Sequence, residues 1–228
     1  VVGWYCATPH SALQNQQTLM LEHIPYWLGQ AMRGFRAGAD KLCIVQLGLD
    51  GDFGAIELRS PAFGNGGRLP PRFTADGEGV SPPLLWGQLP QGTQSIALIV
   101  EDPDAPAREP LVHAIVWGIP PFVHALDEGA IRPDGVGLDN GSDVGRNSYF
   151  FEGWLPPDPP TGHGDHHYAF QLFALGEIDD PGPTPRRGAL LKAMSGKVLG
   201  AGLLTGLYSR GEPTPIVKAQ MGSAARIS

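Results

Sequence analysis

The residues best suited to chemistry fall in three short segments of the sequence. Residues 102–106 read Asp-Pro-Asp-Ala-Pro after an apolar run, His113 follows a few positions later, and residues 162–168 read Gly-His-Gly-Asp-His-His-Tyr. Four of the seven histidines of this 228-residue chain lie in the last two segments. Carboxylates and imidazoles gathered in this way can bind a charged ligand or transfer protons. The sequence therefore predicts a pocket built from these segments.

Prolines restrict the backbone around Asp102 and Asp104. Pro103 favours an extended conformation at Asp102, and residues two apart in an extended chain point to the same side. We therefore expect both carboxylates to face one cavity, where their repulsion raises the pKa of one and lets it donate a hydrogen bond to an anion. The alternative is an ordinary solvated turn, which Asp and Pro also favour.

Alternation along two predicted strands indicates where the histidines point. His113 is expected to share a face of its strand with apolar residues, namely Leu111, Ile115 and Trp117. A lone histidine in such surroundings is commonly a core residue with one hydrogen bond, which is the alternative to a ligand-binding role. On the later strand, His166 and Tyr168 share a face with Phe170 and Leu172, whereas His167 points the other way.

The segment before the later strand is rich in proline. Residues 156–164 read Pro-Pro-Asp-Pro-Pro-Thr-Gly-His-Gly, which excludes a regular helix or a central strand. The prolines make the backbone rigid and the glycines let it adapt, so the segment is suited to form the rim of a pocket. A short polyproline recognition motif is the alternative.

The same residues could instead form a metal site or the active site of a nucleophilic enzyme. His163, His166 and His167 with Asp165 resemble metal ligands, but adjacent strand residues face opposite sides and no second cluster completes the coordination sphere, so we expect no metal and no other cofactor. The sequence has no Gly-x-Ser-x-Gly motif, and no cysteine lies beside these histidines. Acid–base hydrolysis by two aspartates and a histidine remains open.

The elements that must position these residues are mostly strands. From residue 53 onward, short apolar runs alternate with Gly and Pro, which is typical of a β-rich domain with many turns. The predicted strands are residues 55–58, 95–100, 111–119, 166–174 and 203–208. Helical spacing predicts a late helix over residues 186–194 and an amphipathic helix over residues 24–35, which docks on the domain or a dimer partner, or else lies on a membrane surface.

Composition narrows the class of protein. Hydrophobic residues make up 42% of the chain, which is enough for a substantial core. A net charge of -7 and a pI of about 5.4 argue against nucleic-acid binding. Two cysteines exclude a disulfide framework, and no apolar run is long enough to span a bilayer, so integral membrane association is not expected. We expect a cytoplasmic protein, with the periplasm as the alternative.

Five ordered motifs resemble the phosphatidylethanolamine-binding protein family, also called Raf kinase inhibitor protein-like, and in particular its bacterial branch. They are the three segments above together with residues 58–63 (Leu-Arg-Ser-Pro-Ala-Phe) and 81–86 (Ser-Pro-Pro-Leu-Leu-Trp), and the similarity spans about residues 53 to 210. The resemblance implies a mainly β fold of antiparallel sheets with Greek-key connections and peripheral helices at both ends. We accordingly divide the chain into an N-terminal extension, residues 1–50, and a family domain, residues 51–228.

The resemblance also implies a binding protein and not an enzyme. It implies a small pocket for phosphate or a phosphoethanolamine head group, lined by Asp102, Asp104, His113, Pro160, Gly162, His166 and Tyr168. Trp86 and Tyr208 are secondary lining candidates. Two departures from the family pattern affect the rim, because His167 stands where arginine is usual and Gly153-Trp154 replaces an expected Gly-Pro.

The partners implied are a small anionic or phosphorylated ligand and a regulated protein such as a kinase, and a homodimer is plausible. We expect phosphate affinity to fall as pH rises through the titration of the histidines and the aspartate pair. Two functions of other classes remain as alternatives. One is a hydrolase or protease inhibitor that acts through the proline-rich loop, and the other is a metal-dependent hydrolase that uses the Asp/His cluster.

Overall fold

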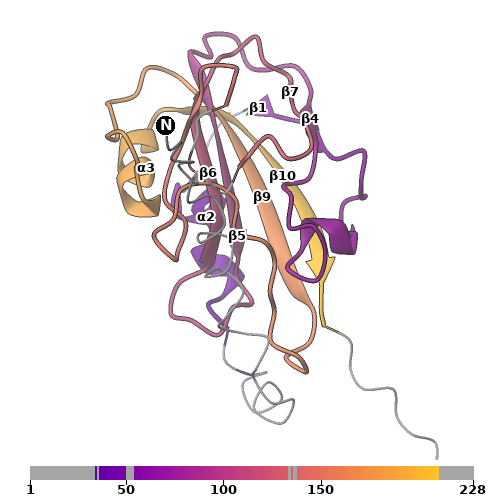
Figure 1. Ribbon diagram of the computed structural model, residues 1–228. Helices are drawn as coiled ribbons and strands as arrows, with labels where there is room; N and C mark the ends of the chain where they lie inside the picture. The colour runs from indigo at the N-terminus through magenta and orange to yellow at the C-terminus, as the bar shows by residue number, and fades with distance from the viewer. Residues whose placement is uncertain (1–33, 35, 50–53, 133–134, 136–137, 211–228) are drawn as a thin grey trace, which may run out of the picture.

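Two sheets lie at the centre of the computed structural model, which describes residues 34, 36–49, 54–132, 135 and 138–210 (Figure 1). Within these residues the larger sheet has seven strands in the order β1, β10, β9, β5, β6, β8, with β3 also paired to β10. Its strands are β1 (Gly54–Ala55), β3 (Gly67–Arg68), β5 (Ser95–Asp102), β6 (Leu111–Ile119), β8 (Asp143–Val144), β9 (His166–Leu175) and β10 (Val198–Tyr208). The smaller sheet consists of β2 (Leu58–Arg59), β4 (Leu84–Trp86) and β7 (Ala125–Leu126). The predicted β-rich fold is confirmed.

The strand pairs are antiparallel except for those that β10 makes with β1 and β3, which are parallel. The helical elements described are short. They are the 3-10 turns η1 (Ala39–Lys41) and η2 (Pro71–Phe73) and the α-helices α2 (Cys43–Gln46) and α3 (Arg187–Met194). The late helix therefore lies where its spacing predicted it.

Two predicted strands differ from the observed ones. The strand expected over residues 55–58 is divided, because β1 pairs with β10 whereas β2 pairs with β4 in the other sheet. Strand β10 begins at Val198 and not at residue 203. Its glycines are sites of close approach and not of chain reversal, since a Cβ at Gly202 would lie 2.6 Å from the carbonyl oxygen of Ile56.

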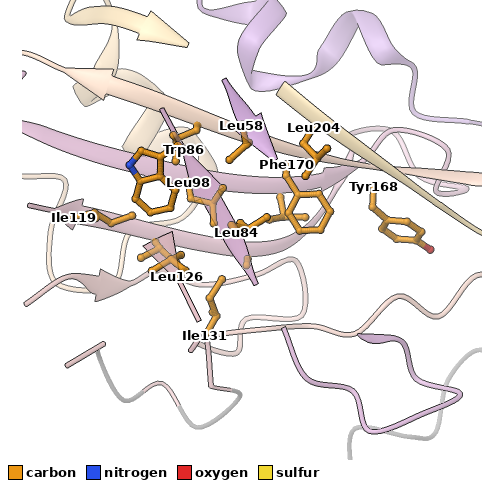
Figure 2. Packing of buried hydrophobic residues seen from close by; sticks show 14 of the residues in the cluster. Leu58, Leu84, Trp86, Leu98, Ile119, Leu126, Ile131, Tyr168, Phe170 and Leu204 are labelled. Atoms are coloured by element: carbon orange, nitrogen blue, oxygen red, sulfur yellow. The ribbon is translucent and has the colours of Figure 1, made fainter. Parts of the chain in front are cut away.

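Both faces of the larger sheet are buried. Along β5, residues Ile96, Leu98 and Val100 belong to a first core, which also holds side chains of the smaller sheet (Figure 2). Ala97 and Ile99 point the other way into a second core, which includes residues of α2 and α3. In Figure 1, α3 lies on the side of the sheet away from β4 and β7. Strands covered on both sides read as continuous apolar runs, and this is why β5, β6 and β9 are visible in the sequence.

A buried carboxylate ties the helices to the sheet. Glu101 is fully buried and accepts hydrogen bonds from the backbone N–H of Cys43 at 2.9 Å and from Nε2 of Gln171 at 2.7 Å. Its other oxygen pairs with Nε of Arg187, whose guanidinium also donates to the carbonyl of Lys41. Residues 36–49 thus lie against the domain, although we assigned them to the extension. The helix predicted over residues 24–35 lies, apart from Gly34, outside the described residues.

Candidate functional site

The Asp-Pro-Asp-Ala-Pro segment is a turn at the end of β5. The backbone N–H of Asp104 donates to Oδ1 of Asp102 at 2.8 Å, which folds the chain back at Pro103. The expectation of an extended segment was therefore wrong, and the turn stated as its alternative is observed. Asp102 is buried, with 2% exposure, while Asp104 lies at the surface end of the turn.

Asp102 lies at one end of a buried chain of hydrogen bonds that continues through His166 to His163. Its Oδ2 lies 2.6 Å from Nδ1 of His166, and Nε2 of His166 lies 2.7 Å from Nδ1 of His163. A carboxylate oxygen accepts, so Nδ1 of a neutral His166 carries the hydrogen and its Nε2 accepts from His163. Both ring nitrogens of His166 are thus occupied by protein groups. This side chain orients its neighbours and has no free donor for a ligand.

Asp104 pairs with a different histidine. Its Oδ2 accepts from the backbone N–H of His167 at 2.8 Å and lies 2.6 Å from Nδ1 of the same residue, and its Oδ1 pairs with Arg36. Partial burial raises the pKa of Asp104, but the hydrogen bonds from His167 and Arg36 outweigh it and hold the pKa below its ordinary value. Asp104 is therefore not the member of the aspartate pair with a raised pKa.

A β-bulge determines on which face of β6 the His113 side chain lies. In the β5–β6 ladder, Val100 is opposite Ala114 and Glu101 is opposite Val112, so His113 is the extra residue on β6. Its ring lies 5.1 Å from the Tyr168 ring, centroid to centroid, whereas Ile115 and Trp117 belong to the second core. The prediction that His113 shares a face with these two residues was wrong, because the bulge reverses the alternation at this point.

Three neighbouring buried rings, those of His113, Trp154 and Tyr168, each carry a polar atom without a hydrogen-bond partner in the described part of the chain. The three atoms are Nε2 of His113, Nε1 of Trp154 and the hydroxyl of Tyr168. The rings of His113 and Trp154 are 6.3 Å apart, and Figure 2 shows the Tyr168 hydroxyl pointing away from the other labelled side chains. An unsatisfied buried polar group costs about 1–3 kcal/mol. A ligand that bonds all three atoms would recover this cost.

Protonation states follow from the surroundings of these groups. Burial lowers the pKa of His113 below 6.5, although the charge of Asp102 acts in the opposite direction. Nδ1 of His113 lies 2.7 Å from the carbonyl oxygen of Leu155 and donates to it, so the free Nε2 of the neutral ring presents a lone pair. Burial raises the pKa of Tyr168 well above its ordinary value, with a further contribution from Asp102, so its hydroxyl stays protonated.

The proline-rich loop borders this cluster. Pro157, Pro159 and Pro160 are buried, and the carbonyl of Pro160 accepts from the backbone N–H of His163 at 3.1 Å. Gly162 has φ 83°, a left-handed conformation that glycine adopts without strain. A loop whose prolines are largely buried is not freely available to a protease, and no observation on the described residues supports the inhibitor alternative.

Of the two secondary lining candidates, Trp86 and Tyr208, only Tyr208 borders the site. The indole N–H of Trp86 donates to the carbonyl of Val123 at 3.0 Å, and Figure 2 shows Trp86 at the opposite end of the labelled cluster from Tyr168. The structure thus leaves Trp86 outside the site. Tyr208 is opposite His166 in the β9–β10 ladder, and its hydroxyl donates to Asp76 at 2.6 Å. It borders the site with its donor already in use.

Comparison with known proteins decides the family. Residues 59–209, well over half of the chain, match the family described as phosphatidylethanolamine-binding protein. The chain belongs to this family. The resemblance inferred from the five motifs is confirmed, and the Asp102, His113 and Tyr168 cluster is a candidate site within a member of the phosphatidylethanolamine-binding protein family.

Relatives of this family member occur in archaea and bacteria. A UPF0098 protein of Methanothermobacter thermautotrophicus is 42% identical over 156 residues, which cover 68% of this chain and 100% of the relative. A UPF0098 protein of Aquifex aeolicus is 39% identical over 173 residues, covering 73% of this chain and 96% of the relative.

Solved structures of bacterial family members are also similar. The phosphatidylethanolamine-binding protein homologue CT736 of Chlamydia trachomatis superposes with a TM-score of 0.61 at 33% identity, covering 69% of this chain and 99% of that one. YbcL of E. coli superposes with a TM-score of 0.64 at 29% identity, covering 68% and 99%.

Three residues of the site were not predicted as its members. Trp154 was noted only as a departure from the family pattern, and His163 only as a possible metal ligand. Arg36 precedes the family match, and its approach to Asp104 depends on a backbone bond from Gly38 to the carbonyl of Pro103 that no local pattern reveals. The sequence did contain a signal for Trp154, because a tryptophan beside the proline-rich loop needs an acceptor for its indole N–H once it is buried.

Two further structural findings concern metal binding and membrane-spanning helices. Within the described ranges, no three His, Cys, Asp or Glu side chains are arranged to hold a metal ion. Over the same ranges, no helix has both the length and the apolar character required to cross a bilayer.

Proposed function

We propose that this protein binds a small phosphorylated ligand, either inorganic phosphate or a phosphoethanolamine head group, at the cluster around His113. The observation that carries the proposal is that the neighbouring rings of His113, Trp154 and Tyr168 each hold a buried polar atom without a partner in the described residues. An indole N–H is only a donor, so the missing group must be an acceptor at that point. A phosphate offers several acceptor oxygens at once, which suits the two donors, the Trp154 indole N–H and the Tyr168 hydroxyl.

Each side chain has a distinct part in this binding. The Trp154 indole and the Tyr168 hydroxyl donate to phosphate oxygens. Neutral His113 accepts from a protonated phosphate oxygen, or takes up a proton and donates to the dianion. The bonds of His166 to Asp102 and His163 hold the wall of the site in position. Asp104 and His167 belong to the outer rim.

The same groups support binding and not catalysis. Tyr168 keeps its proton because burial raises its pKa, and both nitrogens of His166 are occupied, so neither is free to act as a nucleophile or a base. Our proposal is therefore a binding protein. Occupation of the site by a phosphorylated group of a kinase or another protein would then give the regulatory role that the family resemblance implies.

Calorimetric titration tests the proposal, with phosphate, phosphoethanolamine and acetate as ligands and metal ions chelated. Phosphate and phosphoethanolamine should bind, and His113→Gln should weaken both by about tenfold or more, the value of one hydrogen bond to a charged group. The matched control is His124→Gln, since His124 is an exposed histidine outside the site. Equal phosphate affinity in a folded His113→Gln variant and in the wild type would refute the site, and equal binding of acetate would refute the preference for phosphate.

A further inference from the structure

A turn on another part of the molecule exposes three consecutive aromatic side chains. Tyr149, Phe150 and Phe151 are 40%, 60% and 49% exposed, and they make up half of the large hydrophobic side chains exposed in the described ranges. Single exposed apolar residues are ordinary, but three together form an apolar patch of the kind that marks an interaction surface.

The turn is built to hold these rings outward. Buried Asn147 accepts hydrogen bonds on its Oδ1 from the backbone N–H of Tyr149 at 3.0 Å and of Phe151 at 3.3 Å. The backbone N–H of Asn147 donates to the backbone carbonyl of Phe151 at 2.8 Å. Phe150 has φ 68° and is the one residue other than glycine with positive φ among those described. A bulky residue in this conformation is strained, so the exposed ring is held in place at a conformational cost.

A pocket of about 490 Å³ adjoins the turn. Its lining includes Arg146, Ser148, Arg186, Arg187 and Gly188. The guanidinium of Arg186 lies over the Phe150 ring, 4.3 Å from its centroid, and thus joins the pocket to the aromatic patch. We call the pocket and the three aromatic residues together the aromatic–arginine surface.

The charges on this surface favour an anionic partner at one point. Arg187 is paired with Glu101, and Arg146 lies 3.5 Å from Glu152. Glu109 adds a negative charge to the lining. Arg186 is exposed and, among the described residues, has the Phe150 ring but no carboxylate as its partner. It precedes the first residue of α3, where no side chain caps the helix and the backbone dipole also favours negative charge.

The aromatic–arginine surface is separate from the phosphate site. Its lining residue Val112 belongs to the second core with Leu190 of α3, whereas His113 contacts Tyr168 of the first core. The two sites thus use opposite faces of β6. An inference about this surface does not depend on the proposed phosphate binding.

We propose that the aromatic–arginine surface docks an acidic peptide segment of a partner protein. An apolar side chain of the segment enters the pocket, a neighbouring carboxylate pairs with Arg186, and the aromatic rings cover the contact. Tyr, Phe and Arg are enriched in the centres of protein interfaces, where a few such residues contribute most of the binding energy. Charge complementarity is local, because Arg186 attracts a carboxylate whereas the net charge of -7 of the whole chain repels an acidic peptide.

Fluorescence anisotropy with a labelled peptide of alternating glutamate and leucine tests the proposal. The peptide should bind the full chain, more weakly at high salt, and the same peptide with lysine in place of glutamate should not. Phe150→Gly should weaken binding by about tenfold. It should leave the thermal unfolding midpoint unchanged or higher, because glycine adopts the left-handed conformation without strain. Arg186→Glu should abolish binding.

Two control variants match these changes. Phe122→Ser removes an isolated phenylalanine that is 76% exposed, and Arg132→Glu reverses an arginine outside the surface, so both should bind the peptide as the wild type does. Equal affinity for the lysine peptide, or unchanged affinity in a folded Phe150→Gly variant, would overturn the proposal. A dimer in sedimentation that Phe150→Gly dissociates, without peptide binding, would overturn it in favour of a second copy of the chain.

Discussion

At the residue scale, two buried hydrogen-bond donors without partners among the described residues, the Tyr168 hydroxyl and the Trp154 indole N–H, lower the stability of the free protein. Each sits in a nearly fully buried side chain, and neither has a partner in the described structure. Folding therefore removes these groups from water without replacing the lost hydrogen bond, which costs free energy in the unliganded protein. The same groups then bind an anion without having to break an existing bond first.

Tyr168→Phe separates these two effects. Removing only the unpartnered hydroxyl should raise the free energy of unfolding of the free protein by about 1 kcal/mol and weaken phosphate binding by about tenfold. Chemical denaturation and calorimetry measure the two quantities. Tyr208→Phe should instead lower stability, since its hydroxyl is bonded to Asp76. A Tyr168→Phe variant that loses stability would indicate that the hydroxyl has a protein partner in solution.

At the scale of elements, much of the site could be predicted from strand patterns. Alternation correctly separated His166, which is buried, from His167, which is exposed. It failed for His113 because a bulge adds one residue to β6, and the pairing of two strands is not encoded in the periodicity of either one. The turn at Asp104 was stated only as the alternative to an extended segment, and it forms because an Asx hydrogen bond competes with the extended preference before proline.

The attachment of α3 to the sheet depends on a buried ion pair. Arg187→Ala leaves the Glu101 carboxylate buried without its charged partner, and we expect the free energy of unfolding to fall by about 3 kcal/mol or more. Urea denaturation measures the change. Lys192→Ala, at an exposed position of the same helix, should change stability by less than about 0.5 kcal/mol. Equal effects of the two substitutions would contradict the role of the ion pair.

At the scale of the whole molecule, we propose two local anion-binding sites on opposite faces of one sheet in a chain with a net charge of -7. Acid should lower the free energy of unfolding of the unliganded protein, because the pKa of His113 is lowered in the folded state. Below about pH 6.5 the unfolded chain binds a proton that the folded protein does not, so this part of the stability is lost as pH falls toward the folded pKa. A bound anion reverses this preference, and anion affinity should therefore rise as pH falls.

Histidine NMR tests the central claim most directly. The pKa of His113 is measured with ¹⁵N-labelled histidine, without ligand and with saturating sulfate, whose charge is constant over the range, and His113→Gln assigns the signal. We predict a pKa below 6.5 in the free protein and a clear increase when the anion is bound. An unchanged His113 pKa at saturating anion, or a fall, would contradict the assignment of this cluster as the anion site.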